Sequence, residues 1–510
     1  MAISVAVIGS GVMGAGIAQV AAAAGHEVKL YDVRPEAVAK ALGGLSTNFR
    51  RLVEKNRMSA EAAHAAISRV QPASAVDELA DAKLVIEAVS EDLDLKKHLF
   101  TELERVVGDN CILATNTSSL SITAIAATLK QPGRVVGMHF FNPAPVMELV
   151  EVISGLTTDR ACADVVFSIA AAWGKTPVHV KSTPGFIVNR VARPYYGEAL
   201  RLVTENAASP ASLDAVMRES GGFRMGPFEL MDLIGHDVNF AVTRSIFDAY
   251  FGDPRFTPSL IQQELVRAGF LGRKSGRGFF EYGENASSPL PETEPIAPPP
   301  KKVVLSANSA LGEALQQRLK KSEASFIDAT AGDSMAADEA VIAITDGRTA
   351  TERAHETGIR DLVLVDLALD YAGATRLALA KAEQCSTSAY ASAVGLFQAA
   401  GYAITRIRDV PALAVMRTVA MLANEAADAV NQGVCTVDAV DTAMRKGVNY
   451  PIGPLTWADR IGITGICTVL TNLAKHYGED RYRVSPLIRQ LFWTGRTFRD
   501  LQAASLKHEI

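Results

Sequence analysis

The sequence has few cysteines and no excess of positive charge. Its 510 residues include five cysteines, none of them in a C-x-x-C pair: Cys111, Cys162, Cys385, Cys435 and Cys467. This scatter argues against a disulfide framework and a structural zinc site, so we expect no metal and a reducing compartment. Lysine and arginine number 51 against 56 aspartates and glutamates, for a formal net charge of −5. Because a phosphate backbone requires a basic surface, we expect no nucleic-acid partner.

Long hydrophobic runs are also missing. No uninterrupted apolar stretch reaches the roughly 18 residues that a membrane span needs, so we expect no membrane partner. The string ISVAVIGSG follows the N-terminus without a basic segment, so a signal peptide is not expected either. What is present is a globular composition, 48% hydrophobic and 21% charged. We therefore expect a cytoplasmic protein of several domains.

The N-terminal third alternates short apolar strands with amphipathic helices. Residues 93–107 show the apolar spacing of a helix, and strands are predicted at 3–8, 27–31, 84–88, 112–115 and 135–138. Such alternation requires helical crossovers between parallel strands and predicts a doubly wound α/β sheet. Residues 35–70 are too long for one crossover helix and predict a helical hairpin rich in lysine and arginine.

The rest of the chain divides into three further parts. Helical patterns begin near residue 184, and residues 284–302 contain six prolines, which predicts an extended linker. A second, smaller α/β unit follows, with no glycine-rich turn after its first strand and with strands predicted at 303–306, 324–328, 339–344, 361–367 and 402–405.

The last hundred residues repeat the earlier helical segment. MGPFELMDLIG returns as IGPLTWADRIG, SLDAVM as TVDAVD, and GEALRLVTENAAS as ANEAADAVNQGVC. The last match aligns Glu198 with Glu425, and all three blocks are separated by nearly the same distance along the chain. The sequence therefore predicts two copies of one helical module.

The first strand leads into a glycine-rich turn of the form G-x-G-x-x-G that opens a helix. Its glycines, Gly9, Gly11 and Gly14, allow close backbone approach, while the helix N-terminus offers free N–H groups to a pyrophosphate. Asp32 ends the next strand, where a carboxylate binds the adenosine ribose and repels a 2′-phosphate. The pattern predicts an NAD site, although Arg34 nearby favours NADP and a purely structural turn is the alternative.

A second constellation follows the strand at 135–138. His139 stands at the carboxyl end of that strand, where α/β sheets bind ligands, and Glu151 comes twelve residues later. A carboxylate within reach would fix the imidazole tautomer and stabilise the imidazolium, as for a general base. An ordinary ion pair is the alternative.

The loop at 115–119 would open onto the same crevice. Either Ser118 or Ser119 is expected to cap a helix around 120–127, and capping is compatible with a contact to substrate. Asn189, in the string TPGFIVNR, lies at the entry to the helical region.

These strings resemble the L-3-hydroxyacyl-CoA dehydrogenase family. The matching strings run through residues 1–283 in the family's order: VIGSGVMGAGIA, NTSSLSIT, GMHFFNPAPVMELVEVI, TPGFIVNR, GPFELMDLIG and LGRKSGRGFFEY. The resemblance implies an α/β Rossmann domain at 1–183, which includes the hairpin 35–70, and an all-α domain at 184–283. It also implies NAD-dependent oxidation of an (S)-3-hydroxyacyl-CoA to a 3-oxoacyl-CoA.

The resemblance also implies roles for individual residues. His139 becomes the general base, Glu151 the group that orients it, and Ser118 and Asn189 the side chains that bind the substrate's reacting oxygens. Cofactor contacts fall on Gly9, Gly11, Val12, Met13, Gly14, Asp32, Glu91, Lys96, Asn142 and Lys274. Lys55 is the nearest match to a lysine that binds the CoA nucleotide. Asn48 stands where the family has a hydroxyl-bearing residue, which puts that second CoA contact in doubt.

The remainder of the chain resembles long bacterial members of the family, typified by 3-hydroxyadipyl-CoA dehydrogenases of phenylacetate breakdown and longer 3-hydroxybutyryl-CoA dehydrogenases. The resemblance implies a degenerate Rossmann-like domain at 303–408 and a second helical domain at 409–510. That copy has Met416 in place of Asn189, so we expect it to be noncatalytic. We expect a homodimer, or a monomer whose helical copies form an internal pseudo-dimer.

Two other functions stay open at the level of the sequence. One is a dehydrogenase of a free hydroxy acid on the same fold, and the other is an NAD-binding scaffold without turnover. The acyl chain, and with it a place in aromatic or in fatty-acid breakdown, is not assigned by any residue. We expect residues 1–283 to carry the complete dehydrogenase.

Overall fold

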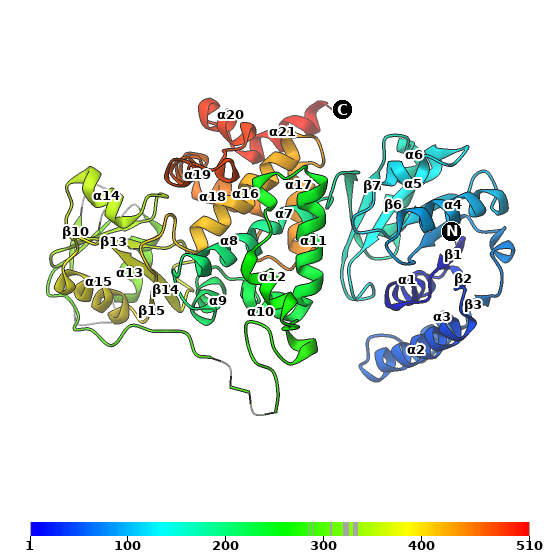
Figure 1. The fold of residues 1–510 in the computed structure, drawn as a ribbon, viewed down its shortest axis with the longest axis horizontal. Coiled ribbons are helices and arrows are strands. Elements are labelled where there is room, and N and C mark those ends of the chain that lie inside the picture. Colours follow the sequence, from blue (N-terminus) through cyan, green and yellow to red (C-terminus); the bar gives the residue numbers. More distant parts are fainter. Residues whose placement is uncertain are drawn as a thin grey trace. The chain divides into compact units, whose positions relative to one another are not determined.

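The computed structural model describes residues 2–284, 286–287, 289–306, 309–319, 326–329 and 335–508. By their contacts they form two units (Figure 1): unit 1 contains Met1–Arg190 and Gln432–Val448, and unit 2 contains Val191–Asn431 and Asn449–Ile510. None of the helices in this described part of the chain has the length and apolar character that crossing a bilayer demands.

Unit 1 is built on a sheet of eight strands in the order β3-β2-β1-β4-β5-β6-β7-β8. The strands are β1 (Ser4–Ile8), β2 (Glu27–Tyr31), β3 (Val70–Ala73), β4 (Leu84–Glu87), β5 (Ile112–Thr115), β6 (Val135–Phe140), β7 (Leu149–Ser154) and β8 (Thr176–Lys181). The five predicted strands are all present. Every neighbouring pair is parallel except β6 and β7, which are antiparallel, so the predicted doubly wound sheet is present and β7, which was not predicted, adds one antiparallel pair.

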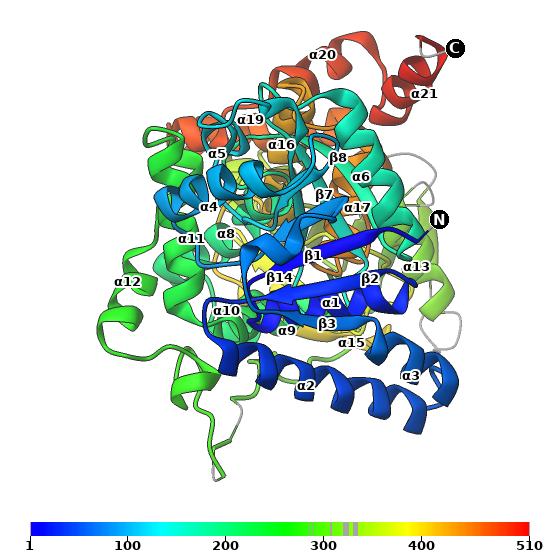
Figure 2. The same cartoon turned by 90° about the vertical axis from the view of Figure 1, so that its right-hand side faces the viewer.

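Helices cover this sheet and explain its apolar strands. Val5 and Val7 of β1 are fully buried, and Ala6 between them is buried as well, because a parallel strand is covered on both faces. The helices are α1 (Val12–Ala23), α2 (Pro35–Glu54), α3 (Ala60–Ser68), α4 (Leu93–Val106), α5 (Ile122–Ala126), α6 (Arg160–Ala172), α7 (Val188–Val191) and α17 (Val437–Gly447). The predicted hairpin is the pair α2 and α3, drawn in dark blue (Figure 2).

Unit 2 contains a second sheet, of seven strands in the order β10-β9-β11-β12-β13-β14-β15. The strands are β9 (Val303–Ser306), β10 (Phe326–Ala329), β11 (Met335–Ala337), β12 (Ala340–Ile344), β13 (Leu362–Val365), β14 (Arg376–Lys381) and β15 (Ala403–Arg406). The pair β13 and β14 is antiparallel, as β6 and β7 are in unit 1, and β11 is antiparallel to both of its neighbours. Residues 324 and 325 of one predicted strand lie outside the described residues.

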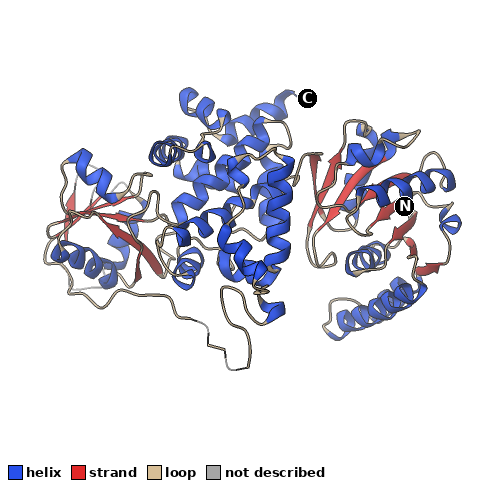
Figure 3. Ribbon diagram, in the orientation of Figure 1, coloured by secondary structure: helices blue, strands red, loops and turns tan. Residues whose placement is uncertain are grey.

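The rest of unit 2 is helical, as the blue ribbons of Figure 3 show. The helices next to the second sheet are α13 (Ala310–Leu319), α14 (Ala350–Thr357) and α15 (Thr387–Ala399). The first helical copy comprises α8 (Arg193–Thr204), α9 (Pro210–Glu219), α10 (Pro227–Ile234), α11 (His236–Ala249) and α12 (Leu260–Arg267). The second comprises α16 (Val415–Asn431), α18 (Pro454–Ile461), α19 (Ile463–Tyr477), α20 (Pro486–Thr494) and α21 (Phe498–His508), together with α17, which belongs to unit 1.

The two helical copies follow one plan. Helix α9 begins at Pro210 and α17 at Val437, and α10 begins at Pro227 and α18 at Pro454, so both pairs of helices keep the same spacing along the chain. The repeat found in the sequence is therefore a structural repeat.

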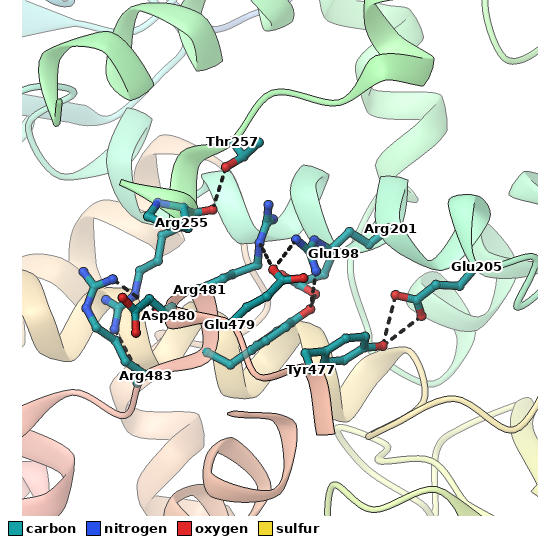
Figure 4. A network of polar contacts seen from close by, with 12 residues as sticks. Glu198, Arg201, Glu205, Arg255, Thr257, Tyr477, Glu479, Asp480, Arg481 and Arg483 are labelled. Carbon is teal, nitrogen blue, oxygen red and sulfur yellow. Dashed lines mark hydrogen bonds and ion pairs between the residues drawn. The ribbon is translucent and has the colours of Figure 1, made fainter. Parts of the chain in front are cut away.

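A buried ionic network within unit 2 joins the two helical copies. The guanidinium of Arg417 is fully buried and donates to Glu198 Oε2 at 2.7 Å and to the hydroxyl of Tyr482 at 2.8 Å. Arg255 of the first copy pairs with Glu425 of the second at 3.1 Å. Figure 4 shows Glu198, Arg255 and their polar neighbours gathered between segments of the two copies. Because an unpaired buried charge is costly, this network fixes how the copies pack.

Candidate active site

The glycine-rich turn has the geometry that a dinucleotide site requires. Gly9 adopts a φ of 94°, a conformation that favours glycine. A Cβ on Gly14 would lie 1.7 Å from the carbonyl oxygen of Gly9, so only glycine lets helix α1 begin this close to β1. A Cβ on Gly11 would meet no atom within 4 Å, which leaves open space beside the N-terminus of α1. The predicted contacts Val12 and Met13 form the first turn of α1.

Asp32 lies just after β2, beside this turn. Its Oδ2 accepts hydrogen bonds from the Ser10 N–H at 2.8 Å and the Ser10 hydroxyl at 2.9 Å, and Oδ1 accepts one from the Arg34 N–H at 3.1 Å. Burial alone would raise the pKa of Asp32, but these hydrogen bonds hold it below its usual range. The Arg34 side chain is 70% exposed, so an anionic carboxylate is the group next to the turn.

His139 and Glu151 form a buried pair. They face each other across the antiparallel strands β6 and β7, and His139 Nδ1 lies 2.7 Å from Glu151 Oε2. The other carboxylate oxygen accepts the N–H groups of Ile187 and Val188, both at 3.0 Å. Glu151 is fully buried and His139 is 6% exposed. With Nδ1–H directed at the carboxylate, Nε2 is the nitrogen free to exchange a proton with a ligand.

The loop that carries Ser118 is organised by Glu91. Oε1 of Glu91 accepts hydrogen bonds from the Thr117 hydroxyl at 2.6 Å and from the Ser118 and Ser119 N–H groups at 2.9 and 3.0 Å. Burial alone would raise the pKa of Glu91, but these donors and the charge of Lys96 hold it below its usual range. The cap of α5 is Ser121, so the predicted cap at Ser118 or Ser119 was wrong. Glu91 holds these two serines through their backbone amides instead.

A buried carboxylate that sequence reasoning missed lies beneath this loop. Glu87, at the end of β4, is fully buried, binds the ammonium of Lys96 and accepts the Thr115 hydroxyl at 2.6 Å. Lys96 is 1% exposed and lies 3.6 Å from Glu91. The lysine predicted to contact cofactor thus joins two carboxylates beneath the Ser118 loop. A glutamate closing an apolar strand, LVIE, was the available signal.

Three predicted residues lie apart from these pairs. Asn189 is the second residue of α7, directly after the amide groups that bind Glu151, and its side chain is half-buried. Asn142 is exposed in the loop that follows β6. Lys274 belongs to unit 2, where its ammonium lies 2.7 Å from Asp237 Oδ2. The contacts predicted between these side chains and ligands stay predictions.

A cavity of about 1370 Å³ adjoins the glycine-rich turn and the hairpin. Its lining includes the predicted CoA residues Lys55 and Asn48, and Asn48 donates to Gln19 at 3.3 Å. Six cationic side chains line it: Arg34, Lys40, Arg51, Lys55, Arg57 and Lys175. Lys175, which the sequence did not single out, binds the carbonyls of the 143–147 loop at 2.6 and 2.9 Å. The cavity suits a polyanionic ligand.

Unit 2 repeats the backbone framework of the His139–Glu151 pair. Gly185 and Phe186 have φ values of 75° and 48°, and Ala412 and Leu413 repeat this turn with 60° and 54°. In each unit the next two N–H groups bind a buried carboxylate: those of Ile187 and Val188 bind Glu151, and those of Ala414 and Val415 bind Asp366.

The two carboxylates come from different strands. Glu151 lies in β7, whereas Asp366 follows β13, the strand whose antiparallel partner is β14. The N–H of Asp366 donates to the carbonyl of Ala378 at 3.0 Å, so Asp366 and Ala378 hold the places of His139 and Glu151. Unit 2 keeps a carboxylate that fixes the turn, with aspartate where unit 1 has its histidine.

Comparison with known proteins agrees with this geometry. The family described as 3-hydroxyacyl-CoA dehydrogenase, NAD binding domain, matches residues 4–183, and its C-terminal domain family matches 185–282 and 414–506. A family described as 3-hydroxybutyryl-CoA dehydrogenase reduced Rossmann-fold domain matches residues 342–411.

Individual relatives cover the chain to different extents. A 3-hydroxyadipyl-CoA dehydrogenase of Escherichia coli K12 is 45% identical over 96% of this chain and 97% of its own length. A probable 3-hydroxybutyryl-CoA dehydrogenase of Bacillus subtilis is 43% identical over 55% of this chain and 98% of its own length. The crystal structure of an Escherichia coli K12 3-hydroxybutyryl-CoA dehydrogenase superposes with a TM-score of 0.88 at 43% identity, covering 96% of this chain and 98% of that one.

Short relatives thus match about half of the chain, whereas the long relatives match nearly all of it. The reduced Rossmann-fold domain and the second helical copy account for the difference. From the glycine-rich turn to the second helical copy, the chain belongs to the 3-hydroxyacyl-CoA dehydrogenase family, whose members are NAD-dependent oxidoreductases.

Proposed function

We propose that this chain oxidises (S)-3-hydroxyacyl-CoA to 3-oxoacyl-CoA with His139 as the general base. The observation that carries the proposal is the buried pair, in which Glu151 holds His139 Nδ1 at 2.7 Å. A glutamate held by two backbone amides and one imidazole is fixed in position, so it directs Nε2 rather than exchanging protons itself. Removal of the 3-hydroxyl proton is the task that this arrangement suits.

NAD fits the residues beside the glycine-rich turn. The open space beside Gly11 and the free N–H groups of α1 suit a pyrophosphate, and the Asp32 carboxylate suits ribose hydroxyls. When bound, NAD supplies the acceptor for the hydride that leaves C3. Asp32 also repels a 2′-phosphate and so favours NAD over NADP.

The proton in this reaction moves to Nε2 of His139. As C3 loses hydride and becomes a carbonyl, the hydroxyl proton passes to the imidazole, and the Glu151 carboxylate stabilises the imidazolium that forms. Ser118 and Asn189 are proposed to hold the reacting oxygens, an orientation effect worth several kcal/mol of barrier. The hydrogen bonds from Glu91 to the Ser118 loop support that role by fixing the loop backbone.

The cationic cavity is proposed to take the nucleotide end of CoA. Its basic side chains come mainly from α2 and the turn after it, with Lys175 on the turn before β8. Phosphate groups bind arginine and lysine through charge-assisted hydrogen bonds, which supports a CoA thioester over a free hydroxy acid. A free acid offers no phosphate to these residues.

The acyl chain is assigned by a competition experiment. Because the long relative is named a 3-hydroxyadipyl-CoA dehydrogenase, we propose that substrate, with 3-hydroxybutyryl-CoA as the competitor. The purified chain is expected to reduce NAD with a higher kcat/KM for 3-hydroxyadipyl-CoA than for 3-hydroxybutyryl-CoA, and with neither free acid, followed by NADH absorbance. Turnover of free acids at the same rate would contradict the CoA proposal. Tight NADH binding without any turnover would identify a scaffold instead.

We further propose a cytoplasmic monomer in which the two helical copies form an internal pseudo-dimer. The buried Arg417–Glu198 and Arg255–Glu425 pairs within unit 2 support the pseudo-dimer. The five cysteines are free thiols, which supports a reducing compartment. Sedimentation at several protein concentrations distinguishes a monomer from a homodimer.

A further inference from the structure

One segment of the second helical copy packs in unit 1. Residues Gln432–Val448 belong to unit 1, whereas the helices before and after them belong to unit 2. Within this segment helix α17 packs against β7 and β8, and Figure 2 shows it beside these strands. Since β7 carries Glu151, the C-terminal half of the chain covers the strand that orients the proposed base.

The segment is anchored to the edge of the sheet in two places. The carbonyl of Val434 accepts the N–H of Lys181, the last residue of β8, at 2.9 Å. The ammonium of Lys446 lies 2.5 Å from Glu148, just before β7. The first contact precedes α17 and the second lies in its last turn, so the whole helix is held along the two strands.

Gly447, the last residue of α17, lies against Leu149 of β7 and against Val188, whose N–H binds Glu151. A Cβ at Gly447 would lie 2.6 Å from Leu149 Cδ2 and 3.0 Å from Val188 Cγ2. Leu149 precedes Glu151 by two residues on the same face of β7, and the N–H of Val188 donates to Glu151. Leu149 is fully buried and Val188 is 2% exposed, so neither side chain has free space into which to retreat.

Cys435 also lies near the pair. Burial raises the pKa of its thiol to about 12; Arg190 opposes this shift, while Glu151 and Asp441 add to it. The thiol therefore stays neutral within electrostatic reach of the Glu151 carboxylate.

The reciprocal packing occurs within unit 2, where a helix of the first helical copy packs against the second sheet. Helix α9 of the first copy packs against β14, and the carbonyl of Ala207 accepts the N–H of Arg408 at 2.9 Å. Ser220, which occupies the position of Gly447 in the first copy, donates to the carbonyl of Arg376 at 2.6 Å. There the strand carries Ala378 where β7 carries Glu151. Each unit therefore has such a contact between a helix and a strand, but a His–Glu pair lies beside it in unit 1.

We propose that helix α17, through Gly447, is a positioning element for the Glu151–His139 pair, so that the second helical copy takes part in catalysis without supplying a catalytic side chain. The absence of a side chain at Gly447 lets Leu149 and Val188 pack at the distances that hold the Glu151 carboxylate against Nδ1. A methyl group there displaces one or both and turns the imidazole away from its productive orientation. The proposal rests on the function proposed above for His139 and Glu151.

Gly447→Ala in the full-length chain tests the proposal. Because a misplacement of about 1 Å costs roughly 100-fold in rate, a shift of a few tenths is expected to lower kcat about 10-fold. The Kd of NADH, measured by fluorescence, is expected to stay unchanged, since the glycine-rich turn is untouched.

Ser220→Ala is the matched control, because it perturbs the reciprocal contact where no His–Glu pair stands. It is expected to lower the melting temperature and leave kcat unchanged. The double variant Gly447→Ala with Leu149→Val, which removes the clashing methyl, is expected to regain kcat. Lys446→Ala removes an exposed anchor without entering the core, and is expected to lower kcat with no change in NADH affinity.

Wild-type kcat in both Gly447→Ala and Lys446→Ala would overturn the proposal. So would an equal loss of kcat in Ser220→Ala, because general destabilisation would then account for both variants. A wild-type chain that turns over no acyl-CoA would instead overturn the proposed function itself, which keeps the two failures distinct.

Discussion

Among single side chains, His139 and Glu151 show how a strand pairing builds a reactive group. Twelve residues separate them in the chain, and the antiparallel pairing of β6 with β7 makes them direct neighbours. Glu151 is then fixed by two amides from the turn before α7. The imidazole is therefore held through Nδ1, and Nε2 is left for the proposed substrate.

His139→Ala is expected to lower kcat by roughly 100- to 10,000-fold, because a general base contributes about that much. The Kd of NADH is expected to stay near the wild-type value, since the imidazole lies outside the glycine-rich turn. Steady-state rates with acetoacetyl-CoA and NADH, together with NADH fluorescence, provide the measurement. His98→Ala, at a histidine on α4, is the control. Equal rates in both variants would remove His139 from the mechanism.

Asp32→Ala is expected to weaken NAD use and improve NADP use. Loss of a charge-assisted hydrogen bond of about 1.5–3 kcal/mol corresponds to a decrease of roughly 10-fold or more in kcat/KM with NAD. With the carboxylate gone, a 2′-phosphate is no longer repelled, so the ratio of kcat/KM for NADP over NAD rises. Asp81→Ala, at a side chain 63% exposed and paired with Lys29, leaves that ratio unchanged. An unaltered ratio in Asp32→Ala would contradict the assignment.

The sequence predicted the individual residues unevenly. The motif strings placed His139 and Glu151 correctly as a possible pair, because each follows or lies in an apolar strand. Glu87 was missed, since a glutamate inside an apolar strand is indistinguishable from an edge residue until its partners Lys96 and Thr115 are known. The cap at Ser121 was missed because several hydroxyls stand in a row, and only the geometry selects one.

At the scale of elements, the basic face of α2 has the clearest consequence. Replacing Lys40, Arg51 and Lys55 by alanine is expected to raise KM for a CoA thioester about 10-fold or more, because three charge-assisted contacts are lost. The KM for an acyl-pantetheine that lacks the nucleotide is expected to stay the same. Arg50→Ala, on the same helix but outside the cavity lining, is the control. An equal rise in both KM values would contradict a role in nucleotide binding.

Elements were predicted well where periodicity was undisturbed. Strands such as β2 and β5 matched their predicted ranges, because each contains buried apolar residues, Val28 and Leu30 in β2 and Leu113 and Ala114 in β5. Of the strands of unit 1, β3, β7 and β8 were not predicted, and β3 and β8 each contain a proline, Pro72 or Pro177. Both strands lie at the edges of the sheet, where a missing N–H is tolerated, and edge position is a property of the assembled sheet.

At the scale of the whole molecule, Arg417→Ala is expected to destabilise unit 2 by about 3–5 kcal/mol, because it leaves the buried carboxylate of Glu198 without its cation. A large fall in melting temperature, followed by circular dichroism, is the expected result. Arg499→Ala, at an exposed position on α21, changes the melting temperature little. A melting temperature close to that of wild type in Arg417→Ala would show that the network does not join the copies.

The duplication was visible in the sequence, but it was not visible that a helix of each copy packs on the sheet that precedes the other copy. Matching strings reveal that two copies of a module exist, and their constant spacing along the chain shows that their helices correspond. Which sheet each copy covers depends on contacts between distant residues, such as Val434 with Lys181. A pattern of local periodicity carries no information about those contacts.

The buried network also bears on stoichiometry and on symmetry. Two identical subunits must use the same residues on both sides of their shared interface. Within one chain the two sides are free to diverge. Here the second copy supplies Arg417 and Tyr482 against Glu198 of the first, whereas the first copy supplies Arg255 against Glu425 and Asp428 of the second. Each chain would then contain two sheets, of which the sheet of unit 1 carries the dinucleotide site. Calorimetric titration is accordingly expected to give one NADH per chain and a hyperbolic isotherm, with no second equivalent site to interact with.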